Sequence, residues 1–437
     1  RLGKTVHFGT VFGICVEKGS ELPVGHKDRK YKGRFVFRGN DVRDQNYDHA
    51  IFQELGSSPA ALEAGKAADF YGLLPGNAIE QSDAEQAYTQ SLLKGVETWV
   101  ELPEDRWPPE WKGIHRPVVP LELALYGHPD SGGYWEEHAE KHVMSVGFER
   151  VPDWRSCFWH PVFKTFLVIY VDDFKLAGPK DKLPEVWKLL RQGIDMEDPH
   201  PMGNFLGCQH EQSEQVSPWT GRKVQTMTYN MEPFLRDCVV KYTELTGNSR
   251  FRRVTTPFVE EPEWADGGVN TPSSPEAIEA TLKEGELKHV AARVLMKVLY
   301  CARMCRYDLL HAIGRLACRV TKWDEACDRA LHRMMCYIHH TYHIRQVGWV
   351  GDSADDVGIH LFADADFGGD KKTSRNTSGA FLCLAGPDTF FPIQAFSKKQ
   401  TAVSHSTPEA EIVAADAAVR QIGIPCLELW DKVLGRD

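Results

Sequence analysis

The chain has 437 residues, of which 42% are hydrophobic and 26% are charged, and its formal net charge at pH 7 is −10. This composition excludes an intrinsically disordered or low-complexity chain and allows two or three domains with substantial cores. Because no run of eighteen apolar residues and no signal peptide is present, and the eleven cysteines are scattered, we expect a reduced intracellular protein without a membrane span, in the cytoplasm or the nucleus.

The first fifty residues alternate apolar runs with basic residues, among them Lys32 and Arg34. Such a pattern predicts a small basic lobe that is rich in β-strands. Residues 46–71 carry several alanines and other good helix formers, which predicts a helix that the glycines from Gly72 onward end.

Residues 78–83 read as a short strand that ends near Asp83. The carboxyl end of a strand is where α/β proteins usually place functional side chains, so Asp83 is a candidate site residue. A turn and a helix are expected next, and they carry Tyr88 five residues later. Without its spacing from Asp83, Tyr88 would be read as ordinary core packing.

The stretch from Phe166 to Gly178 carries the strongest chemical signal. β-Branched and aromatic residues up to Tyr170 predict a buried strand, and a shorter apolar run after the doublet Asp172-Asp173 predicts a return strand. The doublet would then lie at the tip of a hairpin, where neighbouring negative charges repel and a divalent cation shared with a third carboxylate relieves the repulsion. The alternative is that Asp-Asp simply makes a good turn.

Further helices and strands are expected on both sides of this hairpin. Helices are predicted over residues 134–146, 183–193, 232–245 and 290–344, and strands over residues 156–160, 223–231, 358–366, 377–384 and 390–397. The last long helical region is rich in lysine and arginine, which suits a phosphate backbone, although a solvated surface explains any single charge as well. Residues 258–288 are acidic and rich in proline and serine, which predicts a linker or surface loop.

A final helix is predicted to begin at Thr407, because Thr-Pro is a favoured opening. Asp364 ends the first of the last three strands, and Glu409 lies in the first turn of this helix. Two carboxylates so placed form half of a second metal site.

Several short motifs, taken together and in order, resemble the reverse transcriptase and the start of the ribonuclease H domain of copia-type LTR retrotransposon Pol polyproteins. The motifs are YKGRFVFR (31–38), QSDAEQAY (81–88), LALYG (123–127), YVDD (170–173), NFLG (204–207), FADAD (362–366) and STPEAE (406–411). YVDD alone is weak, but the ordered series is specific and spans nearly the whole chain.

The resemblance implies an α+β fold, namely a right-hand polymerase with fingers, palm and thumb, followed by a helical connection and a truncated ribonuclease-H-like α/β domain. Fingers and palm would occupy residues 1–215, and thumb and helical connection residues 216–350, with the acidic loop 258–288. The partial ribonuclease-H-like domain would occupy residues 351–437.

The resemblance also implies roles for individual residues. Catalysis and the binding of two Mg²⁺ ions would fall to Asp83, Asp172 and Asp173. Nucleotide binding would fall to Tyr88, Lys32, Arg34 and Asp130, and the primer grip to Phe205, Leu206 and Gly207. Asp364 and Glu409 would be metal ligands of a partial ribonuclease H site.

The implied activity is RNA-directed DNA synthesis, with an RNA template, a DNA primer or RNA–DNA hybrid and dNTPs as partners. The resemblance also implies association with a particle. Asp130 stands where the family has a nucleotide-binding glutamine, which puts dNTP affinity in question. The chain starts without methionine and ends before the third ribonuclease H aspartate, so we expect a piece of a longer polypeptide with little RNA cleavage.

Two rival interpretations remain. The first is a catalytically inactive, nucleic-acid-binding remnant of such a polyprotein, which the replacement at Asp130 and the truncation favour. The second is an unrelated intracellular α/β protein whose acidic hairpin is purely structural. That interpretation predicts that Asp83 lies far from the hairpin tip.

Overall fold

Two units make up the chain, and the computed structural model describes residues 4–18, 25, 29–52, 57–217, 220–259, 283–369 and 374–435. Unit 1 holds residues 1–61, 81–176 and 181–200, and unit 2 holds residues 62–80, 177–180 and 201–437. The predicted boundaries at 215 and 350 both fall inside unit 2 and stay predictions. Most of the predicted acidic loop, residues 260–282, lies outside the described residues.

The N-terminal part of unit 1 is a five-stranded sheet in the order β2-β1-β5-β6, with β3 also paired to β1. Its strands are β1 (Val6–Lys18), β2 (Lys30–Phe37), β3 (Arg43–Asp44), β5 (Glu97–Glu101) and β6 (Val118–Pro120). β1 runs antiparallel to β2 and parallel to β5. Val11, Phe37, Val42 and Val100 form the buried core of this sheet. The predicted β-rich lobe is therefore confirmed.

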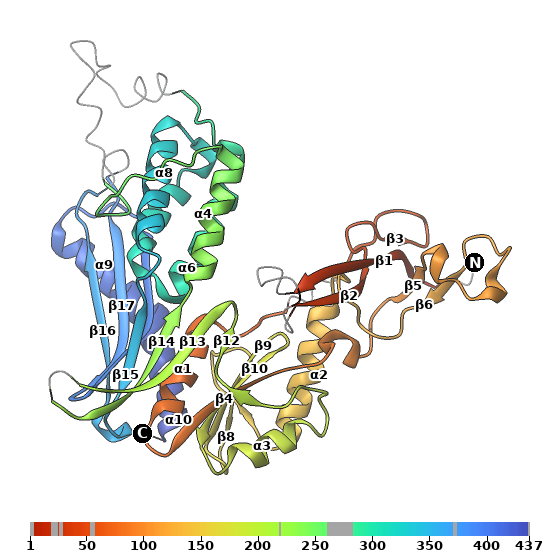
Figure 1. Ribbon diagram of the computed structural model, residues 1–437, viewed down its shortest axis with the longest axis horizontal. Coiled ribbons are helices and arrows are strands. Elements are labelled where there is room, and N and C mark those ends of the chain that lie inside the picture. The colour runs from red at the N-terminus through yellow and green to blue at the C-terminus, as the bar shows by residue number, and fades with distance from the viewer. Residues whose placement is uncertain are drawn as a thin grey trace. The chain divides into compact units, whose positions relative to one another are not determined.

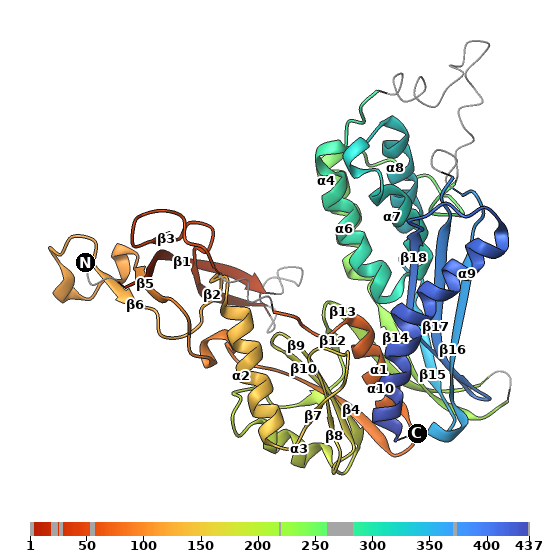
Figure 2. The same ribbon diagram turned by 180° about the vertical axis from the view of Figure 1, so that it is seen from behind.

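A six-stranded sheet carries the acidic hairpin, in the order β11-β4-β10-β9-β8-β7. Its strands are β4 (Asn77–Asp83), β7 (Glu149–Arg150), β8 (Cys157–His160), β9 (Thr165–Tyr170), β10 (Asp173–Pro179) and β11 (His200–Pro201). Helices α2 (Ser131–Ser145) and α3 (Leu183–Leu190) lie beside this sheet (Figure 2). Both helices bury a tryptophan, Trp135 and Trp187, each 2% exposed.

Unit 2 is built on a seven-stranded sheet in the order β12-β13-β14-β15-β18-β17-β16. Its strands are β12 (Asn204–Phe205), β13 (Cys208–Val216), β14 (Lys223–Asn230), β15 (Gln346–Val350), β16 (Gly358–Ala365), β17 (Thr377–Gly386) and β18 (Thr389–Lys399). β15 and β18 meet at the single pair Trp349 and Phe390. Strands from both sides of residue 350 thus share one sheet.

The helices of unit 2 are α1 (Leu62–Leu73), α4 (Glu232–Thr246), α6 (Lys288–Cys305), α7 (Leu310–Ala317), α8 (Glu325–His340), α9 (Thr407–Ala418) and α10 (Ile424–Leu434). α9 packs against β16 and β17, whereas α4, α6 and α8 lie side by side (Figure 1). Within the described part of the chain, no helix combines the length and the apolar character needed to cross a bilayer.

Most predicted helices and strands are confirmed within a few residues, but the helix over residues 46–71 is wrong in its first part. The helix begins only at Leu62. Before it, a carboxylate oxygen of Asp44 accepts hydrogen bonds from the backbone N–H groups of Asn46 and Asp48, and Tyr47 has a φ of 67°. Such a local turn competes with helical hydrogen bonding.

Candidate functional site

The predicted hairpin is present, and its tip carries the two aspartates. β9 is almost wholly buried, and Val171 and Asp172 form the turn before β10 begins at Asp173. Both aspartates are half-buried. The buried strand on one side and the buried run after Asp173 on the other fix the tip against the sheet.

The fold brings Asp83 to this tip. The backbone N–H of Ala84 donates to the carbonyl oxygen of Asp172 at 2.7 Å. The Asp83 and Asp173 side chains share a hydrogen bond. Asp83 therefore does not lie far from the hairpin, contrary to what an unrelated α/β protein predicts.

The electrostatics of Asp83 reflect this crowding. Burial raises the pKa of Asp83, and the negative charges of Glu197 and Asp172 raise it further, whereas the hydrogen bond with Asp173 opposes the shift. Sequence reasoning missed Glu197. A β-bridge between Ala84 and Met196 brings Glu197 next to the end of β4. No sequence motif around Glu197 indicates this position.

Carboxylate oxygens alone make up this cluster, and they are the donors that Mg²⁺ prefers. Among the described residues, however, no group of three or more His, Cys, Asp or Glu side chains is arranged so as to hold a metal ion. The hydrogen bond between Asp83 and Asp173 uses oxygens that a cation would need. The donor chemistry of these side chains fits a divalent cation.

Aromatic rings lie next to the acidic turn. Tyr88 sits in a short 3₁₀ helix, Ala87–Gln90, rather than an α-helix, and its ring centroid is 4.6 Å from that of Tyr126. Burial and the charge of Asp172 raise the pKa of both tyrosines. The Arg34 guanidinium lies over the Tyr126 ring at 5.0 Å. Tyr126 was not among the predicted site residues, although it belongs to the LALYG motif.

The other two predicted nucleotide contacts are placed differently. Lys32 is exposed on β2. Asp130 is only 8% exposed and immediately precedes α2. Its backbone N–H donates to Nδ1 of His128, whose pKa is lowered to about 4 by burial and by the charge of His7. Asp130 thus lies among buried histidines.

The predicted primer-grip segment forms a tight hairpin loop in unit 2. Phe205 is buried, and Leu206 and Gly207 have φ values of 52° and 73°. Two consecutive left-handed residues are typical of a two-residue loop between antiparallel strands, here β12 and β13. The Tyr300 hydroxyl of α6 donates to the Leu206 carbonyl oxygen, which anchors the loop to that helix.

The predicted ribonuclease H carboxylates lie on neighbouring elements, because Ala365 of β16 packs against Ala410 of α9. Asp364 is exposed near the end of β16. Glu409 accepts a hydrogen bond from the backbone N–H of His405 at 2.7 Å, and its own N–H donates to Ser406. This reciprocal arrangement caps α9. The structure therefore shows a capping role for Glu409.

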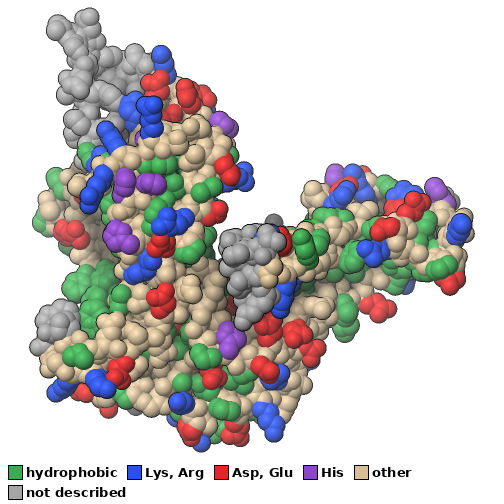
Figure 3. All heavy atoms as spheres, viewed as in Figure 1, with side chains coloured by type: hydrophobic (Ala, Val, Ile, Leu, Met, Phe, Trp, Pro, Cys, Tyr) green, Lys and Arg blue, Asp and Glu red, His purple; other side chains and the backbone are tan. Residues whose placement is uncertain are grey.

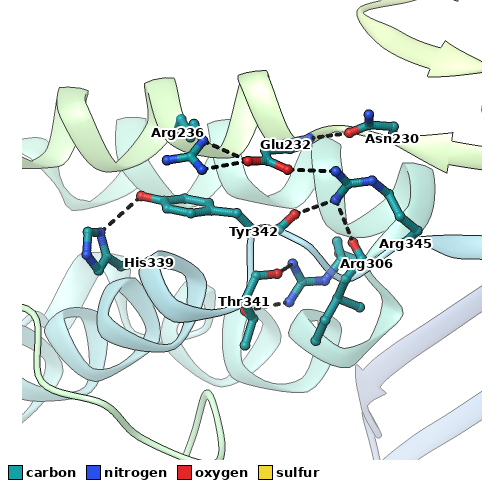
Figure 4. A network of polar contacts seen from close by, with 9 residues as sticks. Asn230, Glu232, Arg236, Arg306, His339, Thr341, Tyr342 and Arg345 are labelled. Atoms are coloured by element: carbon teal, nitrogen blue, oxygen red, sulfur yellow. Dashed lines mark hydrogen bonds and ion pairs between the residues drawn. The ribbon is translucent and has the colours of Figure 1, made fainter.

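Many charges of the predicted basic helical region are held in ion pairs. Arg306 is 1% exposed and binds Asp308 and Thr341, as Figure 4 shows for Thr341. In the same figure, Glu232 joins Arg236 and Arg345. Other basic side chains of α6 and its neighbours pair with acidic partners, namely Lys297 with Asp237, Arg303 with Glu63, and Arg319 with Asp324.

Further exposed arginines lie on the segment that follows α4. Figure 3 shows basic and histidine side chains gathered over the surface of α4 and α8. The 248–259 segment runs along α8, because the Phe251 ring stacks on His339 at 4.7 Å and Arg333 donates to the Thr256 hydroxyl. It carries three exposed arginines, Arg250, Arg252 and Arg253. Sequence reasoning missed them, although the run SRFRR is visible.

Comparison with known proteins yields one informative similarity. No family model matches the chain. The chain is 24% identical over 389 residues to the "Retrovirus-related Pol polyprotein from transposon RE1" of Arabidopsis thaliana, which covers 87% of this chain and 23% of that protein. The chain thus spans less than a quarter of that relative's length. This similarity supports a relationship of the chain to retrotransposon Pol polyproteins.

Proposed function

We propose that the chain is the RNA-directed DNA polymerase part of a copia-type retrotransposon Pol polyprotein. The observation that carries the proposal is the meeting of Asp83 with the Asp172-Asp173 turn, because it joins carboxylates from two separate strands. Polymerases that transfer nucleotides need several carboxylates on rigid strand ends. The similarity to a Pol polyprotein is consistent with this chemistry.

In this proposal Asp83, Asp172 and Asp173 hold two Mg²⁺ ions. When bound, the ions would activate the primer 3′-hydroxyl and neutralise charge on the transferring phosphate. Tyr88, packed against Tyr126, would bar a ribose 2′-hydroxyl, and Arg34 would contact the triphosphate.

The remaining parts of the proposal follow the same resemblance. Residues 1–215, with the primer grip Phe205–Gly207, would supply fingers and palm, and residues 216–350 would supply the thumb and the helical connection. RNA template and DNA primer would lie on basic surface, to which the exposed arginines of the 248–259 segment contribute. Ribonuclease H activity is not part of the proposal.

A second candidate is a catalytically inactive remnant that still binds nucleic acid. Two observations favour it. Asp130, at the position of the expected nucleotide contact, is buried beside His128. The described carboxylates also form no ready-made group of three around a metal position.

Mg²⁺-dependent primer extension on poly(rA)·oligo(dT) separates these candidates. The proposal expects extension by the parent and none by the Asp172→Asn, Asp173→Asn double variant. A matched control changes another adjacent pair, Asp355→Asn with Asp356→Asn, which lies in the short 3₁₀ helix before β16 and should extend like the parent. If the parent binds the primer–template in an anisotropy titration but does not extend it, the remnant interpretation replaces the polymerase one.

A further inference from the structure

The turn at the tip of the acidic hairpin holds a residue in a conformation that its side chain disfavours. Val171 has a φ of 59°, which lies in the left-handed region where a β-branched side chain crowds the backbone. The first position of a two-residue hairpin loop needs such a φ and usually takes glycine or asparagine. Contacts from outside the hairpin must therefore hold Val171 in place.

Two such contacts are present, one on each peptide group of the turn. The indole N–H of Trp135 donates to the carbonyl oxygen of Val171 at 2.7 Å. The backbone N–H of Ala84 donates to the carbonyl oxygen of Asp172, also at 2.7 Å. Helix α2 and the end of β4 thus fix two consecutive carbonyls of the turn. Trp135 is 2% exposed, so water does not compete for its bond.

Side chains do not completely fill the space between the turn and α2. A cavity of about 40 Å³ lies beside Trp135 and Val171, and Pro59 and Ala139 also line it. Side chains that face a cavity lack partner atoms on that side, so Val171 has room to shift. The hydrogen bond from Trp135 is the directional contact that opposes this shift.

We propose that Trp135 is a positioning residue that acts through Val171 and holds Asp172 and Asp173 where they can share a divalent cation with Asp83. This inference rests on the proposed function, which supplies the reason for holding the carboxylates. Trp135 itself contacts neither substrate nor metal in this scheme.

Hydrogen exchange at the turn tests the hydrogen bond without reference to metal or activity. Trp135→Phe keeps an aromatic ring and removes the donor, and amides of residues 170–176 should then exchange about tenfold faster, the order expected for one buried hydrogen bond. The matched control is Trp107→Phe, because the Trp107 indole donates to the Leu102 carbonyl oxygen at 2.9 Å. Adding Val171→Asn to Trp135→Phe should slow the exchange again, since asparagine tolerates a positive φ.

Binding of Mn²⁺, followed by electron paramagnetic resonance, tests the consequence for the carboxylates. Only the binding that the Asp172→Asn, Asp173→Asn variant loses is counted. We expect Trp135→Phe to weaken it about tenfold, Trp107→Phe to leave it unchanged and the Val171→Asn addition to restore part of it.

Unchanged exchange in Trp135→Phe would overturn the inference, as would faster exchange with parental Mn²⁺ affinity. A parent that binds no Mn²⁺ through Asp172 and Asp173 would instead overturn the proposed function. The exchange rates alone would then decide whether Trp135 holds the turn.

Discussion

At the scale of single residues, Asp83 is held between two opposing demands. Burial and the nearby charges of Glu197 and Asp172 raise the pKa of Asp83, although its hydrogen bond with Asp173 opposes the shift. A cation would need the same carboxylate in its ionised form. The protonation state of Asp83 that favours the metal-free fold therefore differs from the one that binds a metal ion.

Replacement of Asp83 by asparagine should stabilise the metal-free protein. Because the pKa of Asp83 is raised above 3.8, the folded chain binds more protons than the unfolded chain in the window between the two values. Stability is thus lost as pH rises through that window and stays lost at neutral pH. We expect Asp83→Asn to raise the melting temperature at pH 7 by roughly 1–3 °C, as for a change of order 1 kcal/mol, while primer extension falls to background.

Thermal unfolding between pH 4 and 7 checks this expectation in buffer free of divalent ions. The difference in melting temperature between Asp83→Asn and the parent should increase with pH and then level off. Asp195→Asn changes an exposed aspartate of the same segment as Glu197 and should show no such growth. If Asp83→Asn were less stable than the parent at pH 7, this result would contradict the raised pKa of Asp83.

At the scale of elements, the hairpin and helix α1 differ in how far the sequence predicts them. β9 and β10 were predicted correctly because their apolar run and its acidic interruption are contiguous. The residue range of α1 was partly predicted, but the burial of its side chains was not. Lys66 lies inside, donating to the Tyr307 hydroxyl at 2.7 Å and to Gln346, which is 280 residues away in sequence. Local periodicity holds no information about partners so distant.

The buried Lys66 should give the protein a distinctive pH dependence. Burial lowers the pKa of Lys66 to about 8, whereas an unfolded chain has a lysine pKa of about 10.4. Between these values the unfolded chain binds more protons, so stability rises with pH from about 8 upward. Lys66→Met should reduce this rise in the free energy of unfolding, measured by urea titration at pH 7.5, 8.5 and 9.5.

Lys188→Met serves as the control, because Lys188 is exposed on α3. It should keep the parental slope between pH 7.5 and 9.5. Measurements stop at pH 9.5, since burial also raises the pKa values of Tyr229 and Tyr307, whose ionisation then disfavours the fold. Equal slopes for the parent and Lys66→Met would show that Lys66 does not titrate inside the fold.

At the scale of the whole molecule, the order of strands and helices was predictable but their assembly was not. The last three strands follow short local patterns and were found correctly. Their union with β12–β15 in one sheet depends on the contact of Trp349 with Phe390, which no local pattern encodes. The parallel pairing of β1 with β5 is equally non-local. The carboxylates at the acidic turn were found through an ordered series of motifs, whereas Glu197 and Trp135 act through contacts that only the fold creates.

The proposed binding of nucleic acid would have to be local in a molecule of net charge −10, and we expect it on the 248–259 segment. Changing Arg250, Arg252 and Arg253 together to glutamine should weaken binding to an RNA–DNA hybrid. If each arginine neutralises one phosphate, the slope of log K against log salt should become shallower by about 2 to 3, from roughly 0.7–0.9 per contact.

The decisive comparison holds the change in net charge constant. Arg116, Arg150 and Lys223 are also exposed, but they pair with Glu101, Glu140 and Glu214. Changing these three to glutamine alters the net charge equally and should leave the salt slope as in the parent, because no phosphate contact is lost. Equal slopes for both triple variants would mean that binding responds to overall charge, and the arginines of the 248–259 segment would then have no special part in it.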